Sequence, residues 1–470
     1  MIKIKFGTDG WRAIIADDFT VENVKRVAYA TALWLKKEFK DASAVVGNDP
    51  RFAGPMFADI TTRVLASQGV KVYRAENAFV STPMISLGTV RKHASAGIII
   101  TASHNPPAYN GYKIKASYGG PATPDDIEKV ESQIPETIDL NRKSIADYQK
   151  DGLVEFVNLE DMYVAHVENN FDLECIRTSG LGWAYDAMYG AGMNVMERLF
   201  PDITRIHSDH NPSFAGQAPE PIQRNLKEFE DIIKMSEGEI ASGLVTDGDA
   251  DRIGLYDQDG NFVDSHHILL LLIHYMHKVK GMTGNVYSTF SCTSKIQKLC
   301  DAYGLKNTVT KIGFKYICDL IVNSGEPFLV GGEESGGIAV AGHIPERDGI
   351  WIGLIVWEFI AKTGRSLSEL VQEIYDIVGK FAVERYDLHV TEDKKQQIIS
   401  NCKSGKYENF GGMKVVKVED MDGYKFHFED ESWVMIRPSG TEPVLRVYAE
   451  APGSKEAFKI LDTVKGVLLS

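Results

Sequence analysis

The sequence predicts an α/β protein of four domains, in which three topologically similar α/β domains precede a smaller C-terminal α+β domain. The chain has 470 residues, more than one hydrophobic core holds at about 100–150 residues per domain. Apolar strands alternate with helical segments, and this alternation restarts twice along the chain. After residue 380 the pattern changes to short alternating strands. We therefore expect domains at residues 1–155, 156–262, 263–379 and 380–470.

The first domain shows the alternation most clearly. Apolar runs predict strands at 44–47, 70–75 and 96–101, and helical spacing predicts helices at 52–67 and 83–93. The run 96–101 (AGIIIT) is typical of a strand that is buried on both faces. Strands that alternate with helices predict a parallel sheet with right-handed crossovers.

The pattern then recurs in the two domains that follow. The expected strands lie at 183–188, 243–246, 285–289, 308–311 and 327–330. The expected helices lie at 193–200, 294–303, 314–322, 351–363 and 367–379. In the last domain, strands at 414–418, 425–428, 433–436 and 445–449 precede a helix at 455–468.

Composition and charge narrow the class of protein. The formal net charge of −14 argues against a general nucleic-acid or anionic-membrane surface. No run approaches the roughly 20 apolar residues of a membrane span, and the start MIKIKFG lacks an apolar secretory region. Five widely spaced cysteines without a CxxC pair indicate reduced thiols. We expect a cytoplasmic enzyme, monomeric or homodimeric, with no nucleic-acid or membrane partner.

A serine follows the buried strand of the first domain. In Thr101-Ala-Ser-His-Asn-Pro-Pro, Ser103 lies in a turn that Asn105 and Pro106 favour. By itself this composition fits an ordinary turn at a strand end. A serine hydroxyl held exposed on such a rigid edge can also carry a phosphate, provided that a metal binds the phosphorylated form.

Three carboxylates follow the strand of the second domain. In Asp247-Gly-Asp-Ala-Asp-Arg they stand at alternate positions, so that Asp247, Asp249 and Asp251 can converge on one hard cation. Like charges this close repel unless a cation neutralises them. An EF-hand loop does not fit, because Arg252 stands where that loop needs glycine and Gln258 where it needs glutamate.

Two further loops and two short motifs carry polar groups. Gly-rich GGEESGG at 331–337 offers Glu333 and Ser335 to sugar hydroxyls. RPSGTEP at 437–443 offers a phosphate cradle, although a surface turn fits it equally well. Arg12 in GTDGWR and Lys113 in NGYK would suit a phosphate clamp and a proton-transfer group.

Taken together and in this order, the motifs resemble those of the α-D-phosphohexomutase superfamily, the phosphoglucomutase and phosphomannomutase group. The resemblance covers residues 6–450 and implies four domains around a central active-site cleft. It implies that Ser103 is the phosphoserine and that Mg²⁺ is bound by an oxygen on Ser103 together with Asp247, Asp249 and Asp251. It also implies catalytic or substrate-binding roles for a wider set: Arg12, His104, Lys113, Arg252, Lys315, Glu333, Ser335, Arg437, Ser439, Gly440 and Thr441.

The resemblance implies an isomerase that interconverts hexose 1-phosphate and hexose 6-phosphate. It would act through phosphoserine and a bisphosphorylated sugar, with sugar 1,6-bisphosphate as activator. Many glucose/mannose and glucosamine members carry histidine where this chain has Gly337, so that contact is either missing or supplied by another residue such as His104 or His343. Glucosamine members usually have glutamine in place of Glu334. These features favour glucose phosphate as the substrate. The alternatives are mannose or glucosamine phosphates on the same scaffold, a metal-dependent sugar phosphatase, and a non-catalytic sugar-phosphate-binding protein.

Overall fold

The computed structural model describes residues 3–7, 9–141, 143–438 and 444–470. The chain divides into two compact units, which are described here separately. The first comprises Met1–Gly284 and Gly313–Leu370, and the second comprises Asn285–Ile312 and Val371–Ser470. Among the helices of these described ranges, none has the length and apolar character that crossing a bilayer requires.

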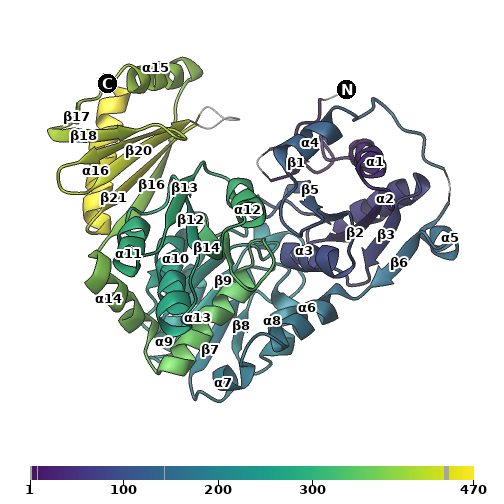
Figure 1. The fold of residues 1–470 in the computed structure, drawn as a ribbon, viewed down its shortest axis with the longest axis horizontal. Coiled ribbons are helices and arrows are strands. Elements are labelled where there is room, and N and C mark those ends of the chain that lie inside the picture. Colours follow the sequence, from purple (N-terminus) through teal and green to yellow (C-terminus); the bar gives the residue numbers. More distant parts are fainter. Residues whose placement is uncertain (1–2, 8, 142, 439–443) are drawn as a thin grey trace. The chain divides into compact units, whose positions relative to one another are not determined.

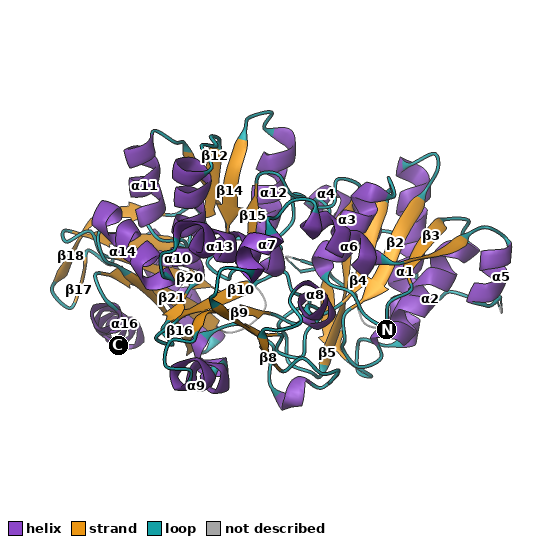
Figure 2. Cartoon of the chain, turned by 90° about the horizontal axis from the view of Figure 1, so that it is seen from below, coloured by secondary structure: helices purple, strands orange, loops and turns teal. Residues whose placement is uncertain are grey.

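The first sheet has six strands in the order β1-β5-β4-β2-β3-β6. They are β1 (Trp11–Ile14), β2 (Ser43–Asn48), β3 (Lys71–Ala75), β4 (Ala96–Ile100), β5 (Tyr109–Ala116) and β6 (Val154–Val157). Helices α1 (Val21–Glu38) and α2 (Gly54–Ser67) lie against one face and α3 (Thr82–Arg91) against the other (Figures 1 and 2). The expected strands and helices of this domain are confirmed.

The predicted parallel pairing holds for most of this sheet but not for one edge. β2, β3, β4 and β6 are parallel, but β5 pairs antiparallel with both β4 and β1. The loop 101–108 between β4 and β5 is too short for a crossover, which takes a dozen or more residues, so β5 returns antiparallel.

The same strand–loop–strand arrangement occurs twice more. β9 (Ile240–Thr246) is followed by the loop 247–252 and the antiparallel β10 (Ile253–Asp257). β14 (Phe328–Gly332) is followed by the loop 333–337 and the antiparallel β15 (Ile338–Val340). Each loop carries one of the sequence motifs, which confirms that the three α/β domains are built alike.

The remaining elements complete the first unit. Its second sheet has the order β11-β10-β9-β7-β8, with β7 (Gly182–Asp186), β8 (Thr204–Ile206) and β11 (Phe262–Val263). The helices before β9 are α4 (Pro124–Glu131), α5 (Ile145–Lys150), α6 (Leu159–Glu168), α7 (Leu173–Arg177), α8 (Met193–Leu199), η1 (Phe214–Gly216), η2 (Gln223–Asn225) and α9 (Lys227–Met235). Those after it are α10 (Ser265–His274), η3 (Tyr275–Val279), α12 (Phe314–Asn323) and α13 (Gly349–Thr363).

The second unit contains the α+β domain that the sequence predicts. β12 (Asn285–Thr289) and β13 (Asn307–Thr310) pair in parallel beside α11 (Lys295–Tyr303), and α14 (Leu367–Val378) leads into the C-terminal part. There a six-stranded sheet has the order β16-β21-β20-β19-β18-β17. Its strands are β16 (Ala382–His389), β17 (Asn409–Phe410), β18 (Met413–Glu419), β19 (Tyr424–Phe428), β20 (Trp433–Pro438) and β21 (Val444–Ala451). The core between this sheet and helices α15 (Glu392–Lys403) and α16 (Ser454–Leu469) includes Ile398, Phe426, Val447 and Leu461. The exact residues at which the four domains begin and end stay predictions.

Candidate active site

Ser103 lies in a strained loop at the carboxyl end of β4. All five residues of β4 are buried, so the chain leaves the sheet from a rigid support. Ser103 has φ 52°, in the left-handed region that few non-glycine residues adopt, and such strain is typical of functional loops. Its N–H donates to Thr101 Oγ1 at 2.9 Å, and Thr101 Oγ1 donates to Asp49 Oδ2 at 2.5 Å.

The sequence predicted an exposed hydroxyl on Ser103, and this prediction is wrong. Ser103 is 1% exposed, because the loop after β9 covers it. Its Oγ donates to Asp247 Oδ2 at 2.8 Å, so the serine and the carboxylates do lie together as predicted. In this structure the hydroxyl is therefore shielded from bulk water and bonded to a carboxylate.

Asp247, Asp249 and Asp251 converge as predicted. One oxygen from each lies within 4.8 Å of the others, and all three side chains are buried. The N–H groups of Asp251 and Arg252 donate to Asp247 Oδ1, which fixes the turn. Within the described part of the chain, Asp249 Oδ1 and Asp251 Oδ1 have no hydrogen-bond partner. Buried carboxylate oxygens without donors fit a hard divalent cation, so this trio can bind metal.

The three buried carboxylates also repel one another, and a bound cation would reduce this repulsion. Burial raises the pKa of Asp247 well above its ordinary value, and the neighbouring charges of Asp249 and Asp251 raise it further. The effect is expected when like charges share a site that excludes water.

Two side chains of the first unit balance this charge from within the protein. Lys113 Nζ lies 2.8 Å from Asp249 Oδ2 and 3.3 Å from Asp251 Oδ2. Burial lowers the pKa of Lys113, but these carboxylates and Asp9 outweigh it, and the net shift is upwards. Arg347 Nη2 lies 2.8 Å from Asp251 Oδ2 and 2.5 Å from Asp9 Oδ2. Both cations therefore contact the carboxylates directly.

Two arginines, Arg12 and Arg252, make the surroundings of Ser103 and of the neutral His104 positive. His104 Nδ1 lies 3.4 Å from Ser103 Oγ, and Arg12 Nη1 donates to Asn105 Oδ1 at 2.7 Å. Burial, followed by the charges of Arg252 and Arg12, lowers the pKa of His104 well below its ordinary value. Arg252 Nε is buried and has no hydrogen-bond partner among the described residues. This group can hold an anion such as a phosphoryl group.

The Gly-rich loop after β14 places Glu333 close to these residues. Its N–H donates to the carbonyl of Gly337 at 3.0 Å, and Gly336 has φ 89°, which explains a glycine there. Glu333 is buried, and burial raises its pKa to about 7, although Arg347 acts in the opposite direction. Its Oε2 lies 3.9 Å from Arg347 Nη1. Ser335 is half-buried in the same loop.

His343 does not take the place of a side chain at position 337. Its Nε2 lies 2.9 Å from Asp348 Oδ2 and its Nδ1 lies 3.2 Å from His166 Nε2, in a separate cluster. The space beside Gly337 is filled by Arg347, whose Cδ would lie 2.4 Å from a Cβ atom on that glycine.

The structure adds residues that sequence reasoning missed. Asp9 and Arg347 contact Lys113 or Asp251, and Thr82 Oγ1 donates to Asp249 Oδ2 at 2.6 Å. Asp9 stands in the GTDGWR motif, whose acidic residue could have been singled out. Arg347 and Thr82 stand in no motif that the sequence analysis used.

The remaining predicted residues have local contacts of their own or lie outside the described residues. Lys315 Nζ lies 5.4 Å from the ring centroid of Tyr316. In the second unit, Arg437 Nε lies 3.3 Å from Asp422 Oδ1. Ser439, Gly440 and Thr441 lie outside the described residues. The substrate-binding roles of these five residues stay predictions.

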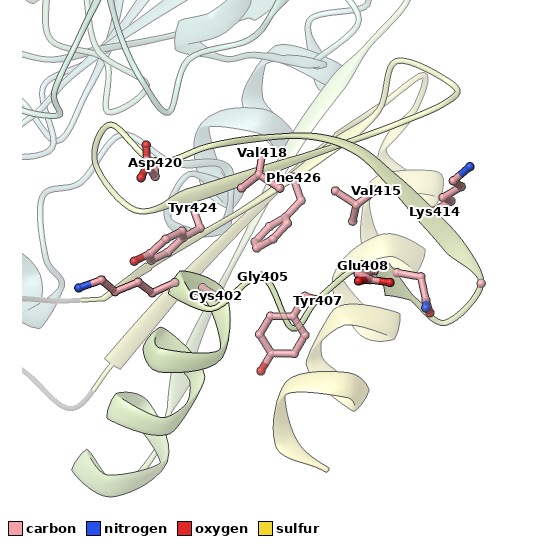
Figure 3. A pocket seen from close by; sticks show the side chains of 13 residues that line it. Cys402, Gly405, Tyr407, Glu408, Lys414, Val415, Val418, Asp420, Tyr424 and Phe426 are labelled. Carbon is pink, nitrogen blue, oxygen red and sulfur yellow. The ribbon is translucent and has the colours of Figure 1, made fainter.

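A cavity of about 930 Å³ in the second unit is unrelated to the motifs (Figure 3). It lies between α15 and the strands β17–β19, with Tyr407, Val415 and Phe426 among its lining residues. Among the predicted site residues that the structure describes, none lines it. Charge and chemistry, rather than cavity size, therefore identify the site at Ser103.

Comparisons with known proteins agree with this geometry. The phosphoglucomutase/phosphomannomutase alpha/beta/alpha domains I, II and III match residues 3–140, 161–260 and 264–378, and the C-terminal domain of that family matches 400–465. A phosphoglucosamine mutase from Methanococcus maripaludis is 30% identical over 97% of this chain and 97% of its own. This chain belongs to the phosphoglucomutase/phosphomannomutase family.

Two further members of the phosphoglucomutase/phosphomannomutase family extend the likeness to the whole chain. A phosphoglucomutase/phosphomannomutase from Thermococcus kodakarensis is 28% identical over 97% of this chain and 96% of its own. A crystal structure from Thermus thermophilus, described as that of a "putative phosphomannomutase", is 30% identical, covers 100% of both chains and has a TM-score of 0.86. As a member of the phosphohexomutase superfamily, the protein is an intramolecular phosphotransferase.

Proposed function

We propose that this mutase interconverts the 1- and 6-phosphates of glucosamine, with Ser103 as the phosphate carrier. The observation that carries the transfer chemistry is the 2.8 Å contact between Ser103 Oγ and Asp247 Oδ2 within a buried carboxylate trio. The choice of sugar rests on the relatives. Full-length relatives from Methanococcus maripaludis and Carboxydothermus hydrogenoformans are named phosphoglucosamine mutases. The glucose preference that the sequence favoured is not confirmed.

Mg²⁺ fits the donor set of the carboxylate trio. Asp247, Asp249, Asp251 and an oxygen on Ser103 would hold it, and it would supply neutralisation of the charge on the transferring phosphoryl group.

The protein's own residues position and neutralise the reacting groups. Arg12, His104 and Arg252 hold the phosphoryl group beside Ser103. Lys113 is the proton-transfer group, and because its pKa is raised it enters as an ammonium ion. It therefore acts as an acid towards a departing oxygen first and as a base only after giving up that proton.

The sugar and its second phosphate need separate contacts. Glu333 and Ser335 hold ring hydroxyls, and a carboxylate such as Glu333 also suits the ammonium group of an aminosugar. The RPSGTEP loop, with Arg437, holds the phosphate that is not reacting. Phospho-Ser103 gives its phosphoryl group to a free sugar hydroxyl, and the resulting 1,6-bisphosphate turns around and returns its other phosphate to Ser103.

Glucose phosphate is the second candidate substrate. The observation that favours it is the loop GGEESGG, in which Glu334 and Gly337 stand where glucosamine members usually have other residues. The test compares kcat/KM for the 1-phosphates of glucosamine, glucose and mannose, each with a trace of its own 1,6-bisphosphate. We expect glucosamine 1-phosphate to have the highest value. A higher value for glucose 1-phosphate would favour the second candidate, and free phosphate as the main product would indicate a phosphatase instead.

The role of Ser103 has its own test. Mass analysis of the purified protein and its peptides should find a phosphate on Ser103. Ser103→Ala should abolish turnover while a hexose phosphate still binds, as measured by calorimetry. Ser86→Ala is the matched control, because Ser86 Oγ is also buried in the first domain and has no hydrogen-bond partner in the described structure. Turnover by the Ser103→Ala variant at a substantial rate would refute the assignment.

A further inference from the structure

Arg51 is a buried arginine whose side chain binds backbone carbonyl oxygens of the loop that contains Ser103. It is 1% exposed and lies between β2 and α2. Its Nη1 donates to the carbonyl oxygens of Pro106 and Tyr109 at 3.0 and 3.1 Å. Its Nη2 donates to those of Ser103 and Asn105 at 2.5 and 2.7 Å. One guanidinium thus contacts four carbonyls of the segment 103–109.

Asp49 fixes both Arg51 and the other side of the loop. Its Oδ2 lies 3.3 Å from Arg51 Nε and its Oδ1 accepts the N–H of Arg51 at 3.0 Å. The same Oδ2 accepts from Thr101 Oγ1, which in turn accepts the N–H of Ser103. Ser103 is therefore held through its N–H by Asp49 and Thr101 and through its C=O by Arg51.

The loop after β9 packs directly against this arrangement. A Cβ atom on Gly248 would lie 2.6 Å from the carbonyl oxygen of Ser103 and 3.6 Å from Arg51 Nη2. The ring of Phe214 lies 4.8 Å from Arg51 Cζ and covers its face. The carbonyl that Arg51 holds therefore also sets the approach of the carboxylate loop to Ser103.

Burying a charged group costs free energy, and in Arg51 this cost is offset by contacts with Asp49 and with loop carbonyl oxygens. Burial lowers the pKa of Arg51, and the nearby carboxylate of Asp49 acts in the opposite direction. The backbone of 101–109 has a non-glycine residue at φ 52°, a conformation that persists only where the surroundings fix it. Four charge-assisted hydrogen bonds supply that constraint.

We propose that Arg51, oriented by Asp49, is a positioning residue for phosphoryl transfer: it fixes Ser103 Oγ in line with the carboxylate trio. The inference rests on the proposed role of Ser103. A misplacement of about 1 Å at a reacting group can reduce the rate about 10²-fold, because the geometry of attack is lost. Substrate binding, which uses other residues, is then little affected.

The test compares Arg51→Gln with Arg74→Gln. Arg74 is a buried arginine of β3, paired with Asp59 at 3.3 Å. It donates to the carbonyl of Ala75 and to Asn48 Oδ1, but to none of the described residues 101–109. Both variants should lower the melting temperature. Only Arg51→Gln should lower kcat, by about 10²-fold, with little change in KM. In single-turnover experiments, its phospho-Ser103 should lose phosphate to the sugar correspondingly slowly. Equal kcat values for the two variants would overturn the proposal.

Arg51→Lys and Arg51→Ala address the case in which Arg51→Gln fails to fold. A lysine keeps the charge but cannot contact four carbonyls, so its kcat should still fall while its secondary structure stays intact. Guanidinium at low millimolar concentration should raise the kcat of Arg51→Ala and leave that of Arg74→Gln unchanged. Wild-type kcat for Arg51→Lys, or no recovery with guanidinium, would overturn the proposal. Absence of phosphate from Ser103 in the active wild-type enzyme would instead refute the proposed function.

Discussion

A Cβ atom on Gly337 would lie 2.4 Å from Cδ of Arg347, closer than two non-bonded carbon atoms can approach. Arg347 passes through this space and reaches Asp251 at 2.8 Å and Asp9. Any side chain at position 337 therefore has to displace a cation that is paired with a predicted metal ligand. The departure at Gly337, seen in the sequence as a missing histidine, is linked in the structure to the presence of Arg347.

Gly337→Ala should therefore reduce both stability and activity. Overpacking of this kind typically costs about 1–3 kcal/mol, and the shift of Arg347 should lower kcat/KM. In the double variant Gly337→Ala/Arg347→Ala the overlap is gone, so adding Gly337→Ala to Arg347→Ala should cost almost no further stability. Thermal denaturation of the four proteins measures this coupling. Gly466→Ala is the control, because no atom lies within 4 Å of a Cβ there. Additive losses in the double variant would contradict the steric explanation.

The carboxylate trio predicts opposite effects of Asp247→Asn with and without metal. In metal-free buffer the variant should melt at a higher temperature than the wild type, because burial and two neighbouring carboxylates disfavour the charge of Asp247. Mg²⁺ should stabilise the wild type, by about 2.7 kcal/mol at 100 times Kd. The variant should gain much less. Equal stabilisation of both proteins by Mg²⁺ would place the cation elsewhere.

Sequence patterns alone predicted where the strands end and which functional residues follow them. Asp247, Asp249 and Asp251 converge because alternate residues share one side of an extended segment, a property that spacing alone reveals. The return strands β5, β10 and β15 were not predicted. Their direction depends on the short loops before them, and the predicted alternation of strand and helix gave no sign of a hairpin.

Contacts over long separations account for most of what the sequence analysis missed. Arg347 is 338 residues from Asp9 and Arg51 is 52 residues from Ser103, so no local spacing links either pair. The burial of Ser103 was missed for the same reason, because the loop that covers it belongs to another domain. The choice of sugar also escapes local patterns, since single positions such as Gly337 and the overall likeness of the chain favour different substrates.

Two buried tyrosines provide a matched test of the structure between α6 and α13. Tyr163 OH donates to the carboxylate of Asp348 at 2.8 Å, whereas the hydroxyl of Tyr185 lies 2.7 Å from that of Thr246. Hydrogen bonds to charged groups contribute about 1.5–3 kcal/mol, against about 0.5–1.5 kcal/mol for neutral pairs. Tyr163→Phe should therefore lower the free energy of unfolding more than Tyr185→Phe. Urea denaturation of the two variants measures this order, and the reverse order would contradict the structure.

Glu333 predicts a pH-dependent gain in stability when its charge is removed. Burial raises its pKa from 4.5 to about 7, so the native protein holds this proton more tightly than the unfolded chain does. The stability of the wild type relative to Glu333→Gln should then be unchanged below pH 4.5, fall as pH rises from 4.5 to 7, and stay level above. The full difference is on the order of 3 kcal/mol in favour of the variant. Melting temperatures at pH 5 and pH 8 measure it, with the exposed Glu326→Gln as control.

Glu333→Gln should also lose mutase activity, because a buried carboxylate that destabilises the fold is explained by its role towards the sugar. A Glu333→Gln protein that is both fully active and no more stable at pH 8 would contradict this role.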